Sequence, residues 1–173
     1  KKFILLLIPF FFSAILLANP GKLNAFNDTL IVKNKVTIKN TQGVVVETYQ
    51  LKKGEKHGAR RVFNNQAGLV LLEQYKNGKL DGTKTIYEPD GKIRRIENYR
   101  YFPTEQKSLL DGKQKKFFNE ILISEITFKK NLKFGPFQYF YNDGKIKERG
   151  TLEGELKTGK FQAYDSKGQL TKD

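Results

Sequence analysis

The stretch KNGKLDGTKTIYEPDG, residues 76–91, contains the spacing that decides the fold of this chain. Gly82 precedes the aromatic residue Tyr87 by five positions, and a second glycine, Gly91, follows nine positions after the first. Asn-Gly and Asp-Gly pairs supply the positive φ angles that tight hairpin turns require. We therefore interpret the stretch as a strand of about five or six residues between two glycine-bearing turns.

The same spacing recurs along most of the chain. The step of five positions from a glycine to an aromatic residue occurs in five places: Gly58 to Phe63, Gly82 to Tyr87, Gly112 to Phe117, Gly135 to Phe140 and Gly159 to Tyr164. A second glycine follows nine or ten positions after the first, and an aliphatic residue comes two positions later: Gly68 with Val70, Gly91 with Ile93, Gly144 with Ile146 and Gly168 with Leu170. The third unit has no second glycine. A period of this length is typical of repeat proteins.

The repeats predict an all-β fold, an elongated antiparallel meander of tandem β-hairpins. The five units are expected at residues 49–74, 75–98, 99–127, 128–150 and 151–173. Residues 29–48 are interpreted as a capping hairpin, with one strand over 31–38, a turn at 40–43 and a return strand at 44–46. A lone hairpin is marginally stable in water, so we expect stacking to join the recurrent aromatic residues into one apolar row. The repeated glycines are then structural, because positive φ explains every one of them.

The N-terminal residues have the pattern of a secretory signal. Lys1 and Lys2 precede an uncharged, mostly apolar run over residues 3–18, which is short for a membrane span of about 20 residues. We expect a signal peptide or hydrophobic helix at 1–18, a linker at 19–28, and export to the periplasm, the cell surface or the medium. An uncleaved N-terminal anchor is the alternative, because neither Ala18 nor Ala25 has a small residue two positions before it.

The composition excludes several classes of site. The 173 residues include 32 Lys and Arg against 18 Asp and Glu, a net charge of +14, with no Cys and one His. A disulfide scaffold, a zinc cluster and a cysteine nucleophile are therefore excluded, and we expect no cofactor and no metal. His57 is interpreted as structural, because the sequence nominates neither a nucleophile nor an orienting group for it. An enzyme acting on envelope glycans is the weakest alternative, since an open meander offers no obvious cleft for paired carboxyl groups.

A candidate contact surface lies on the strand around residue 137. Phe137, Tyr139 and Tyr141 alternate along it and face opposite to Phe140, so one of the two sets is expected to be exposed. Basic residues cluster nearby in the sequence, and we include the following in the contact surface: Arg94, Arg95, Lys115, Lys116, Lys129 and Lys130. The expected partner is a protein or an anionic envelope component, such as lipid headgroups or acidic glycans. Export argues against nucleic acid, and solvated lysines that protect edge strands remain the simpler interpretation.

The segment Lys76 to Gly82, followed by Tyr87 and Gly91, resembles the MORN repeat, whose core reads N-G-K-x-x-G, an aromatic residue, then N-G. Lys56-His57-Gly58 resembles its K-x-H-G corner. The similarity is closer to the MORN-variant repeats of bacterial proteins, often labelled YwqK-type antitoxins, and it covers about residues 49–173. The resemblance implies an elongated, twisted antiparallel meander with a binding or scaffold role. It also implies an alternative, in which an antitoxin or immunity protein neutralises a cognate toxin.

Overall fold

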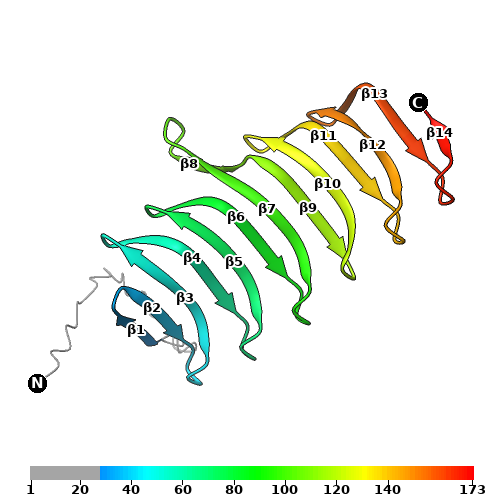
Figure 1. Ribbon diagram of the computed structural model, residues 1–173. Coiled ribbons are helices and arrows are strands. Elements are labelled where there is room, and N and C mark those ends of the chain that lie inside the picture. The colour runs from blue at the N-terminus through cyan, green and yellow to red at the C-terminus, as the bar shows by residue number, and fades with distance from the viewer. Residues whose placement is uncertain (1–27) are drawn as a thin grey trace, which may run out of the picture.

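The computed structural model of the chain describes residues 28–173, which form one antiparallel sheet of fourteen strands (Figure 1). The predicted all-β meander is confirmed. The signal at 1–18 and residues 19–27 of the expected linker lie outside the described residues, and the last residue of that linker, Asp28, begins β1. The strands are β1 (Asp28–Val32), β2 (Lys35–Lys39), β3 (Val45–Lys52), β4 (Glu55–Phe63), β5 (Leu69–Lys76), β6 (Lys79–Tyr87), β7 (Ile93–Phe102), β8 (Lys107–Leu110), β9 (Gly112–Phe118), β10 (Ile121–Lys129), β11 (Leu132–Phe140), β12 (Ile146–Glu153), β13 (Leu156–Tyr164) and β14 (Leu170–Lys172).

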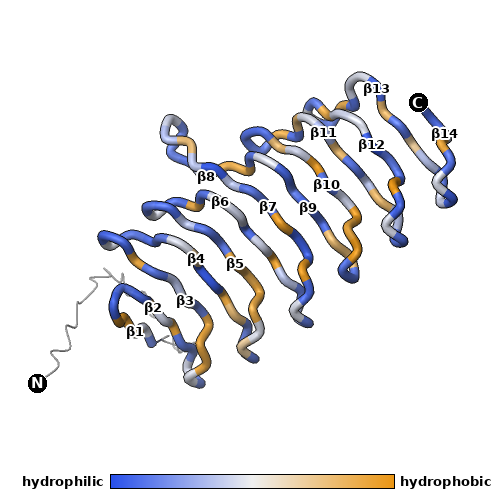
Figure 2. The backbone as a smooth tube through the Cα atoms, viewed as in Figure 1, coloured by the Kyte–Doolittle hydropathy of each residue, from blue (hydrophilic) through white to orange (hydrophobic). Residues whose placement is uncertain are grey.

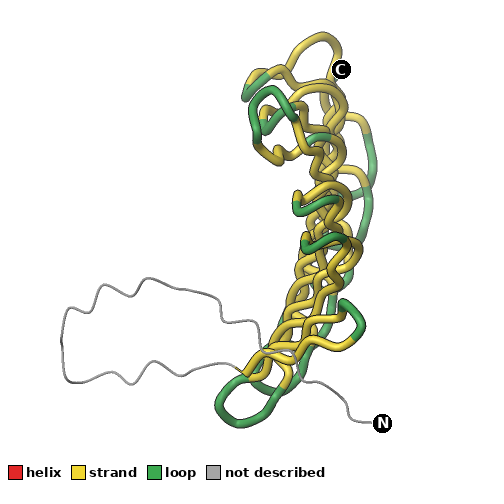
Figure 3. The backbone as a smooth tube through the Cα atoms, turned by 90° about the vertical axis from the view of Figure 1, so that its left-hand side faces the viewer, coloured by secondary structure: helices red, strands yellow, loops and turns green. Residues whose placement is uncertain are grey.

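Strands that follow one another in the sequence are neighbours in the sheet. The one irregularity in strand order concerns β8 and β9, which both pair with β7 and share one strand position, with Asp111 between them. Seen edge-on, the sheet is a single curved layer (Figure 3). Both faces therefore meet solvent, and among the described hydrophobic residues few are buried: Val36, Leu110, Ile126, Phe137 and Leu152.

Two kinds of turn alternate along the meander. Two-residue turns such as Lys53-Gly54 and Asn77-Gly78 have positive φ at both residues, which matches the twist of the flanking strands. Longer turns span five residues, at 40–44, 64–68, 88–92, 141–145 and 165–169. In each of these the N–H of the fourth residue and the carbonyl of the fifth bond to the first residue. All five of the five-residue turns lie on one long edge of the sheet (Figure 1). Most two-residue turns lie on the other edge, and Asn119-Glu120, between β9 and β10, is the exception.

The fourth residue of each five-residue turn takes the left-handed conformation, and this corrects one glycine assignment. Gly91, Gly144 and Gly168 have φ of 86°, 82° and 88°, but in the first unit this place belongs to Ala67, with φ of 60°. Gly68 does not have positive φ; its N–H donates to Asn64 Oδ1 at 2.8 Å. The offset of ten residues in that unit arises because alanine occupies the position nine residues after Gly58.

The N-terminal hairpin differs from expectation, whereas the third unit departs from the other repeats where its second glycine is missing, as expected. The segment 31–38, interpreted as one strand, contains a two-residue turn at Lys33-Asn34, with φ of 47° and 65°, so that β1 and β2 are separate strands. The third unit replaces the five-residue turn by Asn119-Glu120, with φ of 47° and 67°. The expected unit boundaries at 74/75, 98/99, 127/128 and 150/151 all fall inside strands. The sequence repeat is thus out of phase with the hairpins.

A row of side chains crosses the middle of one face of the sheet, and we call it the central row. Cross-strand register and hydrogen bonds connect its members from β3 to β12: Glu47, Arg60, Glu73, Lys84, Glu97, Gln114, Ile126, Phe137 and Gly150. From β3 to β9 the row is polar and charged. From β10 onward it is apolar, although the backbone pairing continues unchanged in kind.

The polar half of the central row is an alternating ladder of charges. Arg60 donates to Glu47 Oε1 at 2.8 Å and to Glu73 Oε2 at 2.7 Å, and Lys84 Nζ lies 3.5 Å from Glu73 Oε1. Glu97 accepts a bond from Gln114 Nε2 at 3.0 Å. Glu73 and Glu97 are 5% and 4% exposed, and buried carboxylates of this kind require such partners.

The apolar half of the central row is a small hydrophobic cluster. Phe137 is 1% exposed and packs with Ile126 and Leu152. Gly150 makes this possible, because a Cβ atom there would lie 2.7 Å from Phe161 Cβ and 3.1 Å from Phe137 Cε1. Phe137 and Phe161 occupy the space that a side chain at position 150 of β12 would fill.

Candidate binding surface

The described residues hold no arrangement that is typical of catalysis or of metal binding. His57 Nδ1 is buried without a hydrogen-bond partner in the described part of the chain, and no serine or threonine is bonded to the ring there. No group of three or more His, Cys, Asp or Glu side chains within residues 28–173 could hold a metal ion. Likewise, this part of the chain contains no helix of the length and hydrophobicity needed to cross a membrane.

The first glycine of each repeat lies within a strand and has positive φ. The values are 76°, 128°, 121°, 109° and 67° for Gly58, Gly82, Gly112, Gly135 and Gly159. Four of them face a large side chain on the next strand: Gly58 faces Tyr75, Gly82 faces Tyr99, Gly112 faces Phe128 and Gly135 faces Leu152. These glycines shape the backbone, and Gly112 also lines an open surface hollow together with Arg100, Asp111 and Lys129.

The repeat aromatics form cross-strand pairs within their own hairpins. Each lies beside an aliphatic residue of the following strand: Phe63 with Leu69, Tyr87 with Ile93, Phe117 with Leu122, Phe140 with Ile146 and Tyr164 with Leu170. In the first unit the partner is Leu69 and not Val70. Ala67, one position before Gly68, holds the left-handed place in the turn, so the partner also comes one position earlier than predicted. All five aromatics are half-buried. The buried hydrophobic cluster consists instead of Ile126, Phe137 and Leu152, and not of the aromatic row expected from the repeat. Apolar residues gather in the strand halves nearest the five-residue turns (Figure 2).

Part of the predicted contact surface is wrong, because Phe137 is buried in the core. Tyr139 is half-buried with its ring centroid 5.2 Å from that of Phe137. Tyr141 is also half-buried, and its hydroxyl donates to the carbonyl oxygen of Tyr164 at 2.7 Å. None of these three rings is therefore exposed as a free apolar surface; the exposed apolar residues of β11 are Leu132 and Phe134, at its other end.

The basic residues of the predicted surface form two separate groups. Arg94, Arg95, Lys115 and Lys116 lie on the adjacent strands β7 and β9, where Arg95 is the register partner of Lys116. Lys129 and Lys130 lie at the other long edge. Arg95 Nε is 3.0 Å from Glu97 Oε1, with its N–H directed away from the carboxylate. Lys115 Nζ is 3.3 Å from Glu125 Oε2 and Lys130 Nζ is 2.6 Å from Glu105 Oε1. Several of these charges are therefore already neutralised within the chain.

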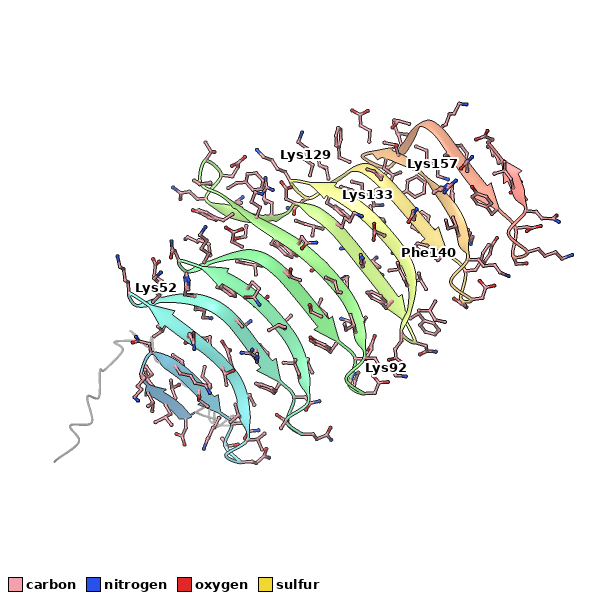
Figure 4. The ribbon with its side chains drawn as sticks, viewed as in Figure 1. Lys52, Lys92, Lys129, Lys133, Phe140 and Lys157 are labelled. Atoms are coloured by element: carbon pink, nitrogen blue, oxygen red, sulfur yellow. The ribbon has the colours of Figure 1, made fainter. Side chains whose placement is uncertain are left out.

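The structure instead separates charge between the two long edges of the sheet. The edge with the turns after β1, β3, β5, β7, β10 and β12 we call the lysine-rich edge. Counted from the last residue of one strand to the first of the next, its turns hold nine lysines and four carboxylates. The turns of the opposite edge hold four lysines and five carboxylates. Figure 4 shows Lys52, Lys129 and Lys133 along the first edge and Lys92 on the second.

Ion pairing enhances the difference between the edges. On the opposite edge, Lys92 lies 3.5 Å from Glu120 and Lys145 lies 3.0 Å from Asp143. On the lysine-rich edge, no carboxylate of the described residues lies within 4.0 Å of Lys52, Lys53, Lys76 or Lys79. Sequence reasoning missed this edge, although the signal was present in the pairs of lysines within or beside the turns after β1, β3, β5 and β10. The strand order was needed to show that alternate turns meet on one side.

Comparison with known proteins supports the repeat assignment. The family model described as MORN repeat variant matches residues 80–101 and 135–153. The first match runs from β6 into β7 and the second from β11 into β12, so each covers two neighbouring strands and the five-residue turn between them. No curated protein matches the chain.

Proposed function

We propose that this chain is an exported, non-catalytic binding module that docks on an anionic surface of the cell envelope through its lysine-rich edge. One observation carries the proposal: the turn residues of this edge have a net charge of +5, and those of the opposite edge have −1. A protein that needed lysines only for solubility would have no reason to gather them on one side.

The spacing of the lysines suits a flat, charged partner. Strands lie about 4.8 Å apart, so hairpins two strands apart present their turns about every 10 Å along the edge. The first three turns, at Lys33-Asn34, Lys53-Gly54 and Asn77-Gly78, each have two lysines within or beside them. At physiological salt the Debye length is about 8 Å, so an anionic surface has to come close to the edge before it is attracted strongly.

The hairpins at the C-terminal end of the lysine-rich edge add exposed apolar side chains. Leu132 and Leu156 follow successive turns of this edge and are 67% and 72% exposed, and Phe134 is 46% exposed. Lys129 Nζ lies 5.2 Å from the centroid of the Phe134 ring. Leu132 and Phe134 lie beside Lys129 and Lys130, whereas Leu156 follows the acidic turn Glu153-Gly154-Glu155. Apolar groups among lysines favour contact with an interface that is both charged and partly apolar, which supports lipid headgroups over a purely polar glycan.

The test compares two variants with the same change in net charge. The first, K52E/K53E/K76E/K79E, reverses four lysines on the lysine-rich edge; the second, K39E/K92E/K145E/K167E, reverses four on the opposite edge. We expect the first variant to lose at least tenfold in affinity for phosphatidylglycerol vesicles, and the second to lose much less. Co-sedimentation at low and high salt measures both, with phosphatidylcholine vesicles as the neutral reference.

Each outcome of this experiment decides something. Equal losses in both variants would show that net charge, and not the edge, drives binding, and would overturn the proposal. Salt-indifferent binding by the unmodified chain would also overturn it. Binding to an acidic protein without any binding to vesicles would replace the membrane by a protein partner on the same edge.

The resemblance to YwqK-type antitoxins supplies the alternative function, the neutralisation of a cognate toxin. It requires a toxin gene beside the gene for this chain and a tight one-to-one complex of the two products. Co-expression of the two genes and rescue of growth would establish it. An isolated gene would remove its support.

A further inference from the structure

The two ends of the sheet differ in how their outer strands are protected. At the C-terminal end, β14 has three residues, one of which is Lys172, and short, charged strands are poor templates for further pairing. At the N-terminal end, β1 has five exposed residues, DTLIV. Leu30, Ile31 and Val32 are 53%, 54% and 55% exposed. Within the described residues, β1 has a neighbour on one side only, β2.

β1 is also regular, unlike β14 at the other end of the sheet. Its pairing with β2 runs without interruption from Asp28↔Lys39 to Val32↔Lys35. The pairing of β2 with β3, and that of β13 with β14, both contain a register shift. Bulges twist an edge away from further pairing, so β1 lacks both of the devices that protect the other end.

The turn that closes the first hairpin fixes which backbone groups of β1 point outward. Val32 and Lys35 flank a two-residue turn, so they exchange hydrogen bonds with each other. Bonded and non-bonded pairs alternate along an antiparallel ladder, so Leu30 also bonds to β2. The N–H and C=O groups of Thr29 and Ile31 therefore point away from β2.

We propose that β1 pairs antiparallel with β1 of a second copy of this chain, centred on Leu30. In this register Thr29 exchanges two hydrogen bonds with Ile31 of the partner subunit, and Ile31 does the same with Thr29 of the partner subunit. Leu30 then faces Leu30 of the partner subunit in a non-bonded pair, where side chains lie closest. The register ends at Val32 because Lys33, with φ of 47°, has already left the extended conformation.

Charge supports a second copy as the occupant. Asp28 is the one charged residue of β1, and the symmetric register puts it opposite Val32 of the partner subunit. Asp28 is paired with Lys39 of its own β2 on the same face of the sheet. On its other side, beyond Val32 of the partner subunit, lies Lys35 of the partner subunit. No like charges face each other across the junction, although the chain as a whole has a net charge of +14.

A two-fold axis through this junction is perpendicular to the sheet. The sheets of the two copies then continue into each other, and their lysine-rich edges lie on opposite long sides. If the lysine-rich edge binds anionic surfaces, the dimer would bind one surface on each of its two long sides. The two edges could not bind the same flat surface together. This consequence rests on the proposed function, but the dimer itself does not.

The absence of cysteine from the chain allows a direct test. In a non-bonded antiparallel pair the Cα atoms are about 4.5 Å apart, within the range that a disulfide can bridge. We expect L30C to form a disulfide-linked dimer on mild oxidation of the full chain. L170C, on the other edge strand, is the matched control and should form no disulfide-linked dimer.

A second measurement keeps the proposal falsifiable if L30C disturbs the fold. Light scattering after size-exclusion chromatography should give a dimer for the unmodified chain and a monomer for I31K, while L170K remains a dimer. Circular dichroism checks that the variants remain folded. A monomeric unmodified chain, or L30C that oxidises no more readily than L170C, would overturn the proposal.

Discussion

The polar and apolar halves of the central row solve the same packing problem with different chemistry. In β4–β7 the positions between strands are filled by Arg60, Glu73, Lys84 and Glu97, and in β10–β12 by Ile126, Phe137 and the space above Gly150. The backbone ladder is the same in both halves. In a one-layer sheet, therefore, the side chains of this row need cross-strand complementarity more than they need hydrophobicity.

The two halves should respond differently to substitution. Replacing a buried ion pair by apolar groups is often neutral, but removing one partner leaves an uncompensated charge. Apolar side chains lose their stabilisation in proportion to the atoms removed and the cavity left behind. The polar half is thus sensitive to charge and pH, and the apolar half to volume.

The largest effect is expected at the centre of the apolar half. Phe137→Ala removes the most deeply buried large side chain among the described residues, and we expect a loss of about 3 kcal/mol in the free energy of unfolding. Phe134→Ala, three residues away and 46% exposed, is the control and should cost far less. Urea unfolding of both variants measures the difference, and equal losses would show that the cluster does not stabilise this half.

The strand glycines sharpen the comparison, since each half has one of the same kind. Gly82 and Gly135 have φ of 128° and 109°, but a Cβ at Gly82 would lie 2.9 Å from Gln74 Cβ, and one at Gly135 would lie 3.6 Å from Thr127. We expect Gly82→Val to cost about 2 kcal/mol or more from backbone strain and crowding, Gly135→Val somewhat less, and Lys79→Ala almost nothing. Thermal unfolding of the three variants tests the order; the same melting temperature for Gly82→Val and Lys79→Ala would contradict it.

In the polar half, removal of one charge should cost less than the loss of Phe137. Glu73→Ala leaves Arg60 and Lys84 without their shared partner, and we expect a loss of about 2 kcal/mol. Glu153, which is exposed on β12, is the matched control, and its replacement by alanine should change stability by less than about 0.5 kcal/mol. If the two variants unfold at the same urea concentration, the ladder contributes nothing to stability.

The smallest effect concerns pH. Burial raises the pKa of Glu47, but the hydrogen bond from Arg60 and the charges of Arg60 and Lys56 lower it by more, so the pKa lies below the usual value. A carboxyl whose pKa is lower in the folded chain stabilises the fold above its unfolded pKa, near 4.5, and this stabilisation is lost as pH falls through the folded value.

Acid should therefore weaken the polar half first. Hydrogen exchange at pH 7 and below pH 4.5 should show amide protection falling in β3–β5 before it falls in β10–β12. Glu47→Gln should remove up to about 1 kcal/mol of this pH dependence. Equal loss of protection in both halves would show that the ladder does not set the acid response.

The architecture could be predicted from the sequence because most turns contain residues that favour positive φ. Asn77-Gly78 and Asp90-Gly91 have the residues that positive φ favours, and the strands between them follow. Lys33-Asn34 and Ala67 were missed for the same reason, since neither has glycine at the left-handed position. Tertiary pairing holds these residues in a conformation that their own preferences disfavour.

The sites were less predictable, because they depend on which residues become neighbours. Phe137 and Tyr139 have similar neighbours in the sequence. On β12, however, the residue opposite Phe137 is Gly150, and the residue opposite Tyr139 is Glu148. The lysine-rich edge likewise depends on the alternation of turns across the sheet, which no single repeat contains. Local spacing specifies each hairpin, and the register between hairpins specifies the surface.

The alternation of turns has a consequence for how such a chain can change in length. Contacts between strands run almost entirely between neighbours in the sheet, so a whole hairpin can be duplicated or deleted without disturbing distant parts. Duplication of a hairpin such as β5–β6 would add the pair of lysines Lys76 and Lys79 to the same side once more. Duplication of a hairpin within the gene could therefore lengthen the sheet, and with it the binding edge, by two strands at a time without any change of fold.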